Sequence, residues 1–169
     1  MTDIAAGLPE ANLIAGGPEG DGDIRLSGNL LGLDYGDKTV GVAFCDKSVS
    51  VAVGVEIIRR ERPAKMRRTL SRICEICSAK SVDGIILGYP VHLSGRAGDR
   101  CEKTLAFKNL LEARTQLPVI LWDERLTSVA AEEAMTQTGL SFTEQKQYVD
   151  ELAAMLILQD YINAGNGNS

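Results

Sequence analysis

The run DGIILGYP, residues 83–90, restricts the possible folds of this chain more than any other feature. It is short, continuously apolar and closed by glycine and proline, which is typical of a central strand that is covered on both faces. Such a strand needs neighbouring strands at its sides and helices above and below the sheet. The chain is therefore expected to adopt an α/β fold.

The segments around this run complete a predicted sheet. Strand-like segments joined by turn-forming residues precede it at 30–34, 39–45 and 49–58, and they predict an antiparallel meander. Helical periodicity or helix-ending signals predict helices at about 64–80, 99–115, 127–138 and 148–163, and PVILW at 118–122 is the remaining strand. The expected architecture is a five-stranded mixed sheet, with three antiparallel strands followed by two parallel ones and helices on both faces.

One domain accounts for most of the 169 residues. Residues 1–28 carry glycine, proline and acids without periodicity and are expected to form a flexible N-terminal tail, followed by the domain at 29–164 and a short tail at 165–169. No apolar stretch approaches the roughly 18 residues of a membrane span, and the N-terminus lacks the pattern of a signal peptide. A cytoplasmic protein without a membrane partner is therefore expected.

The net charge of −5 argues against nucleic-acid binding through a positive field over the whole molecule. Basic residues are nevertheless concentrated in IIRRERPAKMRRTLSR, residues 57–72. They are Arg59, Arg60, Arg62, Lys65, Arg67, Arg68 and Arg72. Two interpretations remain open, a solvated basic helix face and a surface that contacts phosphates.

Cysteine and histidine give little support to zinc or to nucleophilic catalysis. Cys74 and Cys77 form a C-x-x-C pair inside a helical pattern, with no second pair at ligand spacing, so buried reduced thiols are expected. His92 is the only histidine and follows Pro90 in a predicted loop, which disfavours mechanisms that need a Ser/His or Cys/His pair.

Acidic residues stand at three comparable places in the predicted fold. Asp34 ends the first strand, and Asp123 and Glu124 end the fifth at the edge where open α/β sheets place their ligands. Asp150 shares a helix face with Ala153, Ala154, Ile157 and Tyr161, an apolar surface that is unusual for a charge. An aspartate in a first helical turn also favours the helix dipole, which is the structural alternative.

Carboxylates that converge must be neutralised, and a divalent cation does so effectively. Oxygen ligands select hard ions such as Mg²⁺ or Mn²⁺. Two such ions about 4 Å apart support hydrolysis of a phosphodiester bond without a histidine. In the stretch DYGDK, Gly36 would let a phosphate or metal approach the backbone and Lys38 would meet a phosphate, although the stretch also suits a polar hairpin turn.

The motifs resemble those of the YqgF or RuvX family of resolvases and pre-16S rRNA nucleases, which has a ribonuclease H-like fold. LGLDYGDKTVGVA resembles the family's D-x-G-x-K-x-x-G segment, and IILGYPVHLSG resembles its G-x-P loop. LWDERLTSVAAEEAM and VDELAAMLILQDYI are similar to its two remaining blocks. The resemblance covers about residues 30–163.

This resemblance implies a cytoplasmic, metal-dependent endonuclease that acts on structured RNA or branched DNA. Its metal-binding and catalytic acids fall on Asp34, Glu124 and Asp150, and the choice of Glu124 over Asp123 rests on the resemblance alone. Maturation of the 5′ end of pre-16S rRNA is the favoured role, and cleavage of Holliday junctions is the alternative. The basic residues expected around the acids are Lys38, Arg96, Arg100, Lys103 and Arg125.

Two further classes of function compete with a nuclease. Actin-like and sugar-kinase ATPases share the superfold and also begin with an acid-glycine hairpin, but they normally duplicate the domain. A non-catalytic RNA or protein adaptor would keep the fold without turnover. Neither the oligomeric state nor the preference between RNA and DNA is encoded in a recognisable pattern.

Overall fold

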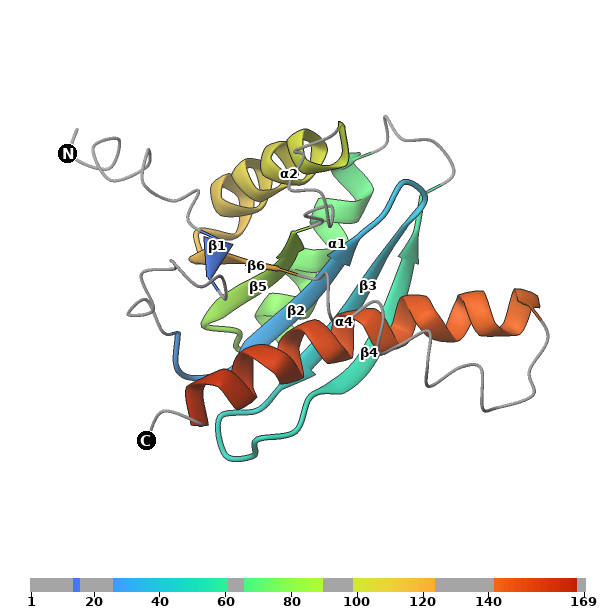
Figure 1. Ribbon diagram of the computed structural model, residues 1–169. Coiled ribbons are helices and arrows are strands. Elements are labelled where there is room, and N and C mark those ends of the chain that lie inside the picture. The colour runs from blue at the N-terminus through green and yellow to red at the C-terminus, as the bar shows by residue number, and fades with distance from the viewer. Residues whose placement is uncertain (1–13, 16–25, 61–65, 90–98, 124–141, 167–169) are drawn as a thin grey trace.

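A mixed β-sheet forms the centre of the molecule, with α1 and α2 on one face and α4 across the other (Figure 1). The computed structural model describes residues 14–15, 26–60, 66–89, 99–123 and 142–166. The strands are β1 (Ile14–Ala15), β2 (Leu30–Tyr35), β3 (Thr39–Cys45), β4 (Val53–Arg59), β5 (Gly84–Tyr89) and β6 (Val119–Asp123). The helices are α1 (Met66–Ala79), α2 (Asp99–Thr115) and α4 (Phe142–Asn166).

The strand order is β1-β6-β5-β2-β3-β4. Strands β2, β3 and β4 pair antiparallel, whereas β5 pairs parallel with both β2 and β6. The five predicted strands and their directions are thereby confirmed. Strand β1 adds two residues, parallel to β6, from a segment in which the sequence pattern predicts only a tail. A two-residue strand is too short to show a period, which explains why no pattern reveals it.

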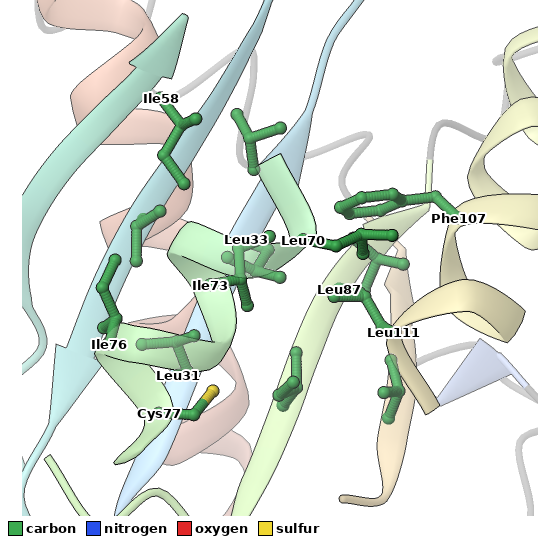
Figure 2. Packing of buried hydrophobic residues seen from close by; sticks show 14 of the residues in the cluster. Leu31, Leu33, Ile58, Leu70, Ile73, Ile76, Cys77, Leu87, Phe107 and Leu111 are labelled. Carbon is green, nitrogen blue, oxygen red and sulfur yellow. The ribbon is translucent and has the colours of Figure 1, made fainter. Parts of the chain in front are cut away.

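Each face of the sheet has its own apolar core, because successive side chains of a strand point to opposite faces. On the α1/α2 face, Leu31 and Leu33 pack with Ile73 of α1 and Phe107 of α2 (Figure 2). On the α4 face, Ala43 and Trp122 belong to the cluster that includes residues 154, 157, 158 and 161 of α4. All six residues of β5 are buried, as expected for a strand that is covered on both sides.

Two helices agree closely with their predicted ranges and a third is longer. Helix α2 has the predicted bounds, and α1 starts two residues later than predicted. Helix α4 begins at Phe142, six residues before the predicted start. Residues 143–147 are all polar, so they show no apolar periodicity that would reveal a helix. Four of these five residues are Glu, Gln or Lys, which have good intrinsic helix propensity. The helix predicted at 127–138 lies outside the described residues. None of the helices within the described ranges is long and apolar enough to cross a membrane.

Candidate active site

Asp34 is the second-to-last residue of β2 and is half-buried. Strand alternation places it on the α4 face, together with Gly32 and opposite Leu33. Gly41 of β3 is its cross-strand partner, and the register that pairs Leu33 with Leu87 brings Gly88 of β5 beside it on the other side. The carboxylate therefore stands between two residues without side chains on this face.

Helix α4 crosses the face that carries Asp34. The predicted apolar side of this helix is confirmed, since Ala153, Ala154, Ile157 and Tyr161 are all buried. The Tyr161 hydroxyl accepts a hydrogen bond of 2.7 Å from the backbone N–H of Leu26, just before β2. Helix α4 and strand β2 therefore run in opposite directions, so residues nearer the N-terminus of α4 lie nearer the C-terminal end of β2.

The contact between Gly32 and α4 shows toward which end of β2 residue 150 of the helix lies. A Cβ atom on Gly32 would lie 3.0 Å from the Ala154 carbonyl oxygen and 2.7 Å from Leu158 Cβ. Asp34 is two strand residues beyond Gly32, about 6.6 Å, and Asp150 is about one helical turn, 5.4–6 Å, before Ala154. Both steps lead toward the same end of the sheet, so the α4 backbone at residue 150 lies toward the end that carries Asp34. The Asp150 side chain lies outside the described part of the chain.

Strand alternation fixes the face on which Asp123 stands at the end of β6. Asp123 follows Trp122, which is part of the α4-face core, and shares its side of the strand with Leu121 on the α1/α2 face. It pairs in register with Tyr89 of β5, which also belongs to the α1/α2 core. Asp123 therefore stands on the face opposite Asp34. Glu124, the next residue, lies outside the described residues.

The β2–β3 turn is the polar hairpin that the stretch DYGDK suggests. The Gly36 N–H donates a hydrogen bond of 2.8 Å to the Thr39 carbonyl oxygen. A Cβ on Gly36 would lie 3.2 Å from that same oxygen, so even alanine would be tight here. Lys38 is exposed at this end of the sheet. The turn thus leaves the Lys38 side chain accessible at the end of the sheet that carries Asp34.

The basic run at 57–72 divides into three environments. Arg59, Arg67 and Arg68 are exposed, and none of them forms an ion pair with another described residue. Arg72 is also exposed but binds Glu56 at 2.6 Å and Glu75 at 3.0 Å. Arg60 is only 7% exposed. Arg62 and Lys65 lie outside the described residues.

The charge of Arg72 is balanced by its partners. Its guanidinium donates three hydrogen bonds of 2.6–3.1 Å to the two Glu56 carboxylate oxygens. These bonds hold the pKa of the Glu56 carboxyl below its usual value. Arg72 is therefore a structural arginine on the same helix as Arg67 and Arg68.

The remaining predicted phosphate contacts are only partly described. Arg100 and Lys103 are exposed in the first turns of α2. The N-terminus of α2 lies at the end of the sheet that carries Asp34, because Phe107 of α2 stacks on Tyr35 with ring centroids 4.2 Å apart. Arg96 and Arg125 lie outside the described residues, as does His92.

All four cysteines are free thiols, and Cys45, Cys77 and Cys101 are buried. Burial is the main cause that raises the pKa of Cys77 to about 11, so this thiol stays protonated at neutral pH. For the C-x-x-C pair, the prediction of buried thiols is confirmed for Cys77, whereas Cys74 is only half-buried.

The described side chains supply only part of a metal site. Within the described ranges, no group of three or more histidine, cysteine, aspartate or glutamate side chains is placed to hold a metal ion. Of the three predicted acids, the structure describes the side chain of Asp34 alone. Its surroundings suit a hard cation, since the donor is an oxygen and the flanking residues are glycines.

Comparison with known proteins identifies the family. The family model described as "RuvX: Holliday junction resolvase" matches residues 28–164. A protein of Agathobacter rectalis named "Putative pre-16S rRNA nuclease" is 52% identical over 134 residues, which cover 79% of this chain and 94% of the relative. A protein of the same name from Bacillus subtilis is 39% identical over 137 residues, which cover 81% and 99% of the two chains.

The fold has a counterpart among solved structures. RuvC of T. thermophilus, solved in complex with a Holliday junction substrate, aligns with a TM-score of 0.53. The alignment covers 83% of this chain and 96% of that one at 16% sequence identity, so it supports the ribonuclease H-like fold alone. The match of the family model over most of the chain, together with relatives of up to 52% identity, shows that this protein belongs to the RuvX family.

Proposed function

We propose that this protein is a metal-dependent endonuclease that matures the 5′ end of pre-16S rRNA. Membership of the RuvX family establishes the coarser class, a hydrolase that acts on phosphodiester bonds. The observation that carries the finer proposal is the position of Asp34. It stands half-buried between glycines at the end of β2, on the face that α4 crosses, and the α4 backbone at residue 150 lies toward the same end of the sheet.

The proposed catalytic acids are Asp34, Glu124 and Asp150. The placement of Asp123 on the α1/α2 face supports the choice of Glu124, because alternation gives the next residue of an extended strand to the α4 face. Two carboxylates brought together there would repel each other strongly unless a cation neutralised them. A meeting of Asp34 and Asp150 at this end of the α4 face would therefore favour metal binding over a purely structural role for either acid.

These acids fit Mg²⁺ or Mn²⁺ by their chemistry. Carboxylate oxygens are the preferred ligands of both ions, and the residues on either side of Asp34 are glycines, whose lack of side chains would suit a shell completed by water and phosphate. When bound, a pair of such ions would supply an activated water and charge stabilisation for the leaving oxygen. The protein's own contribution is to hold the three carboxylates in fixed positions on β2, on α4 and after β6.

The positions of the exposed basic residues favour one path for the phosphate backbone of the substrate. Lys38 and Arg59 lie beside the β2–β3 turn, where the Arg60 N–H binds the Lys38 carbonyl oxygen at 2.8 Å. Arg67 and Arg68 occupy the first turn of α1. The C-terminal end of this helix lies near the start of β2, because the Asn29 side chain donates a hydrogen bond to the Lys80 carbonyl oxygen. The first turn of α1 therefore lies toward the other end of β2. The exposed cations thus share the end of the sheet that carries Asp34.

Replacing Arg67 and Arg68 together with glutamine is expected to weaken RNA binding about 10-fold at low salt. The slope of log K against log salt should become shallower by about 1.4–1.8, which corresponds to two lost phosphate contacts. Fluorescence anisotropy with a labelled pre-16S rRNA fragment, in the Asp34→Asn background to prevent cleavage, measures both quantities.

Arg72→Gln is the matched control, because it removes an exposed arginine of the same helix whose charge is already balanced. Its affinity and salt slope should equal those of the parent protein. If Arg72→Gln weakens binding as much as the double variant, or if neither changes the slope, α1 is not a phosphate-binding surface.

Asp150→Asn is expected to reduce cleavage about 100-fold or more and to leave the unfolding midpoint unchanged, because the lost ligand lowers metal affinity more than stability. Glu151→Gln removes the neighbouring carboxylate of α4 and should keep normal activity. Cleavage rates and circular-dichroism melting curves of both variants provide the test. Unfolding of Asp150→Asn at room temperature would assign Asp150 a structural role instead.

One experiment decides between the proposed activities. The purified protein is incubated with a labelled pre-16S rRNA fragment and with a four-way DNA junction, each in Mg²⁺ and in Mn²⁺. Cleavage at the 5′ end of the RNA supports the proposal. Selective cleavage of the junction favours the second candidate, a resolvase, which the family's description and the substrate bound to the T. thermophilus neighbour suggest. Binding of RNA without cleavage of either substrate would support an adaptor, and micromolar ATP binding without cleavage would support an ATPase.

A further inference from the structure

Arg60 differs from its neighbours in the basic run because it is buried. It follows the last residue of β4 and is 7% exposed, while the adjacent Arg59 is solvent-exposed. Ile58, two residues earlier, is also buried in the α1/α2 core. The strand alternation of β4 thus continues through Arg60 and points its side chain into the protein.

The guanidinium of Arg60 binds the β2–β3 turn from the α1/α2 face of the sheet. Its Nη2 donates hydrogen bonds to the carbonyl oxygens of Gly36 and of Asp37, the latter at 2.8 Å. Its Nη1 donates to the Tyr35 hydroxyl at 3.2 Å. The guanidinium carbon also lies 4.7 Å from the centroid of the Tyr35 ring, within the range of a cation–π contact. One side chain therefore fixes the residues that directly follow Asp34.

This contact continues into helix α2. The Tyr35 ring stacks on Phe107 with centroids 4.2 Å apart and an interplanar angle of 15°. Phe107 is 1% exposed and packs in the α1/α2 core (Figure 2). Arg60, Tyr35 and Phe107 therefore form a clamp, which ties the turn to the interior of the protein on the face opposite the Asp34 carboxylate.

Stability alone is a poor explanation for this clamp. Among the described residues, no carboxylate pairs with Arg60, and its buried Nε–H has no hydrogen-bond acceptor. Burying a guanidinium without a carboxylate partner carries a large desolvation cost that carbonyl oxygens and a ring only partly offset. A well-packed apolar residue at this position would avoid that cost, but it would not bind the turn carbonyls.

We propose that Arg60 is a positioning residue, whose forked guanidinium fixes the β2–β3 turn so that Asp34 is held ready to bind its cation. This inference rests on the proposed nuclease function, because it assigns the turn a catalytic task. The fork is essential to it, since two turn carbonyls and the Tyr35 hydroxyl are bound at once. Lysine has a single ammonium group on a flexible stem and cannot reproduce this geometry.

The test compares Arg60→Met and Arg60→Lys with Arg72→Met, which removes an exposed arginine that does not touch the turn. Amide hydrogen exchange is read at the Gly36 N–H, which bonds to Thr39, and at the Val82 N–H, which bonds to Cys77 at the other end of the sheet. Both Arg60 variants should speed exchange at Gly36 about 10-fold relative to Val82. Arg72→Met should leave this ratio unchanged.

Cleavage kinetics provide the second readout. Both Arg60 variants should lower kcat about 10-fold or more, with KM for the RNA changed less than about threefold, since neither variant removes a side chain of the proposed phosphate path. Tyr35→Phe keeps the stacked ring and loses one acceptor, so it should show a smaller change of the same kind. This variant decides the question if both Arg60 variants fail to fold.

The outcomes separate this inference from the function on which it rests. Equal acceleration of exchange at Gly36 and Val82, or full recovery of protection and kcat in Arg60→Lys, overturns the positioning role. A wild-type protein that cuts neither RNA nor DNA overturns the proposed function, while the exchange ratio still decides whether Arg60 orders the turn.

Discussion

Replacing Asp34 with asparagine is expected to reduce cleavage of the RNA precursor by about 1,000-fold or more, because loss of a metal ligand removes several kcal/mol of charge stabilisation in the transition state. Asparagine has nearly the same shape, so the variant should stay folded. Single-turnover cleavage of labelled RNA in Mn²⁺ measures the effect, and a melting curve checks the fold.

Asp123→Asn provides a control that is specific to the topology. Asp123 also ends a parallel strand at this edge of the sheet, but it stands on the α1/α2 face. Its replacement should change cleavage less than about threefold, as expected for a residue outside the site. Equal residual activity in Asp34→Asn and the wild type would point to a contaminating nuclease, and equal losses in both variants would contradict the assignment of faces.

Gly32→Ala is expected to lower the free energy of unfolding by about 1–3 kcal/mol, the usual cost of overpacking. The new Cβ would lie 2.7 Å from Leu158 Cβ and 3.0 Å from the Ala154 carbonyl oxygen, so α4 must move away from the sheet. Because α4 also carries Asp150, cleavage should fall together with stability. Urea denaturation monitored by circular dichroism measures the loss.

Gly54→Ala is the matched control for this close packing. A Cβ on Gly54 would meet only the flexible side chain of Met155, with its sulfur at 3.4 Å. Alanine is also better than glycine within a strand, so stability should stay the same or rise by up to about 1 kcal/mol. If the two alanine variants were equally stable, the backbone of α4 would not be seated on Gly32 as described.

Much of the fold follows from apolar patterns that depend on neighbouring residues alone. The continuous run of β5 predicts a doubly covered strand, and the spacing of residues 153, 154, 157 and 161 predicts the buried side of α4; the structure confirms both. Such patterns arise because burial on a sheet or helix imposes a fixed period on the sequence. Where the period is missing, as at the start of α4 and in β1, the element was not predicted.

The candidate site was predictable to a smaller extent. The position of Asp34 at a strand end can be read from the sequence, but its flanking glycines come from strands that are distant in the chain, and only the register reveals them. The clamp was missed because Arg60 stands among six other basic residues that suggest a solvated surface. The sequence IIRR at 57–60 shows no alternation, and only the structure reveals that Ile58 and Arg60 share the buried side of β4.

The docking of α4 on β2 has a consequence for when this protein becomes active during synthesis. The bond from Leu26 to Tyr161 joins residues 135 positions apart, so α4 can settle on the sheet only after a very long loop has closed. The hairpins of β2, β3 and β4 are local and can form while the ribosome is still translating. Under the proposed function, a nascent chain without α4 would therefore display Asp34 but lack Asp150, and hydrolysis would be withheld until translation had passed that helix.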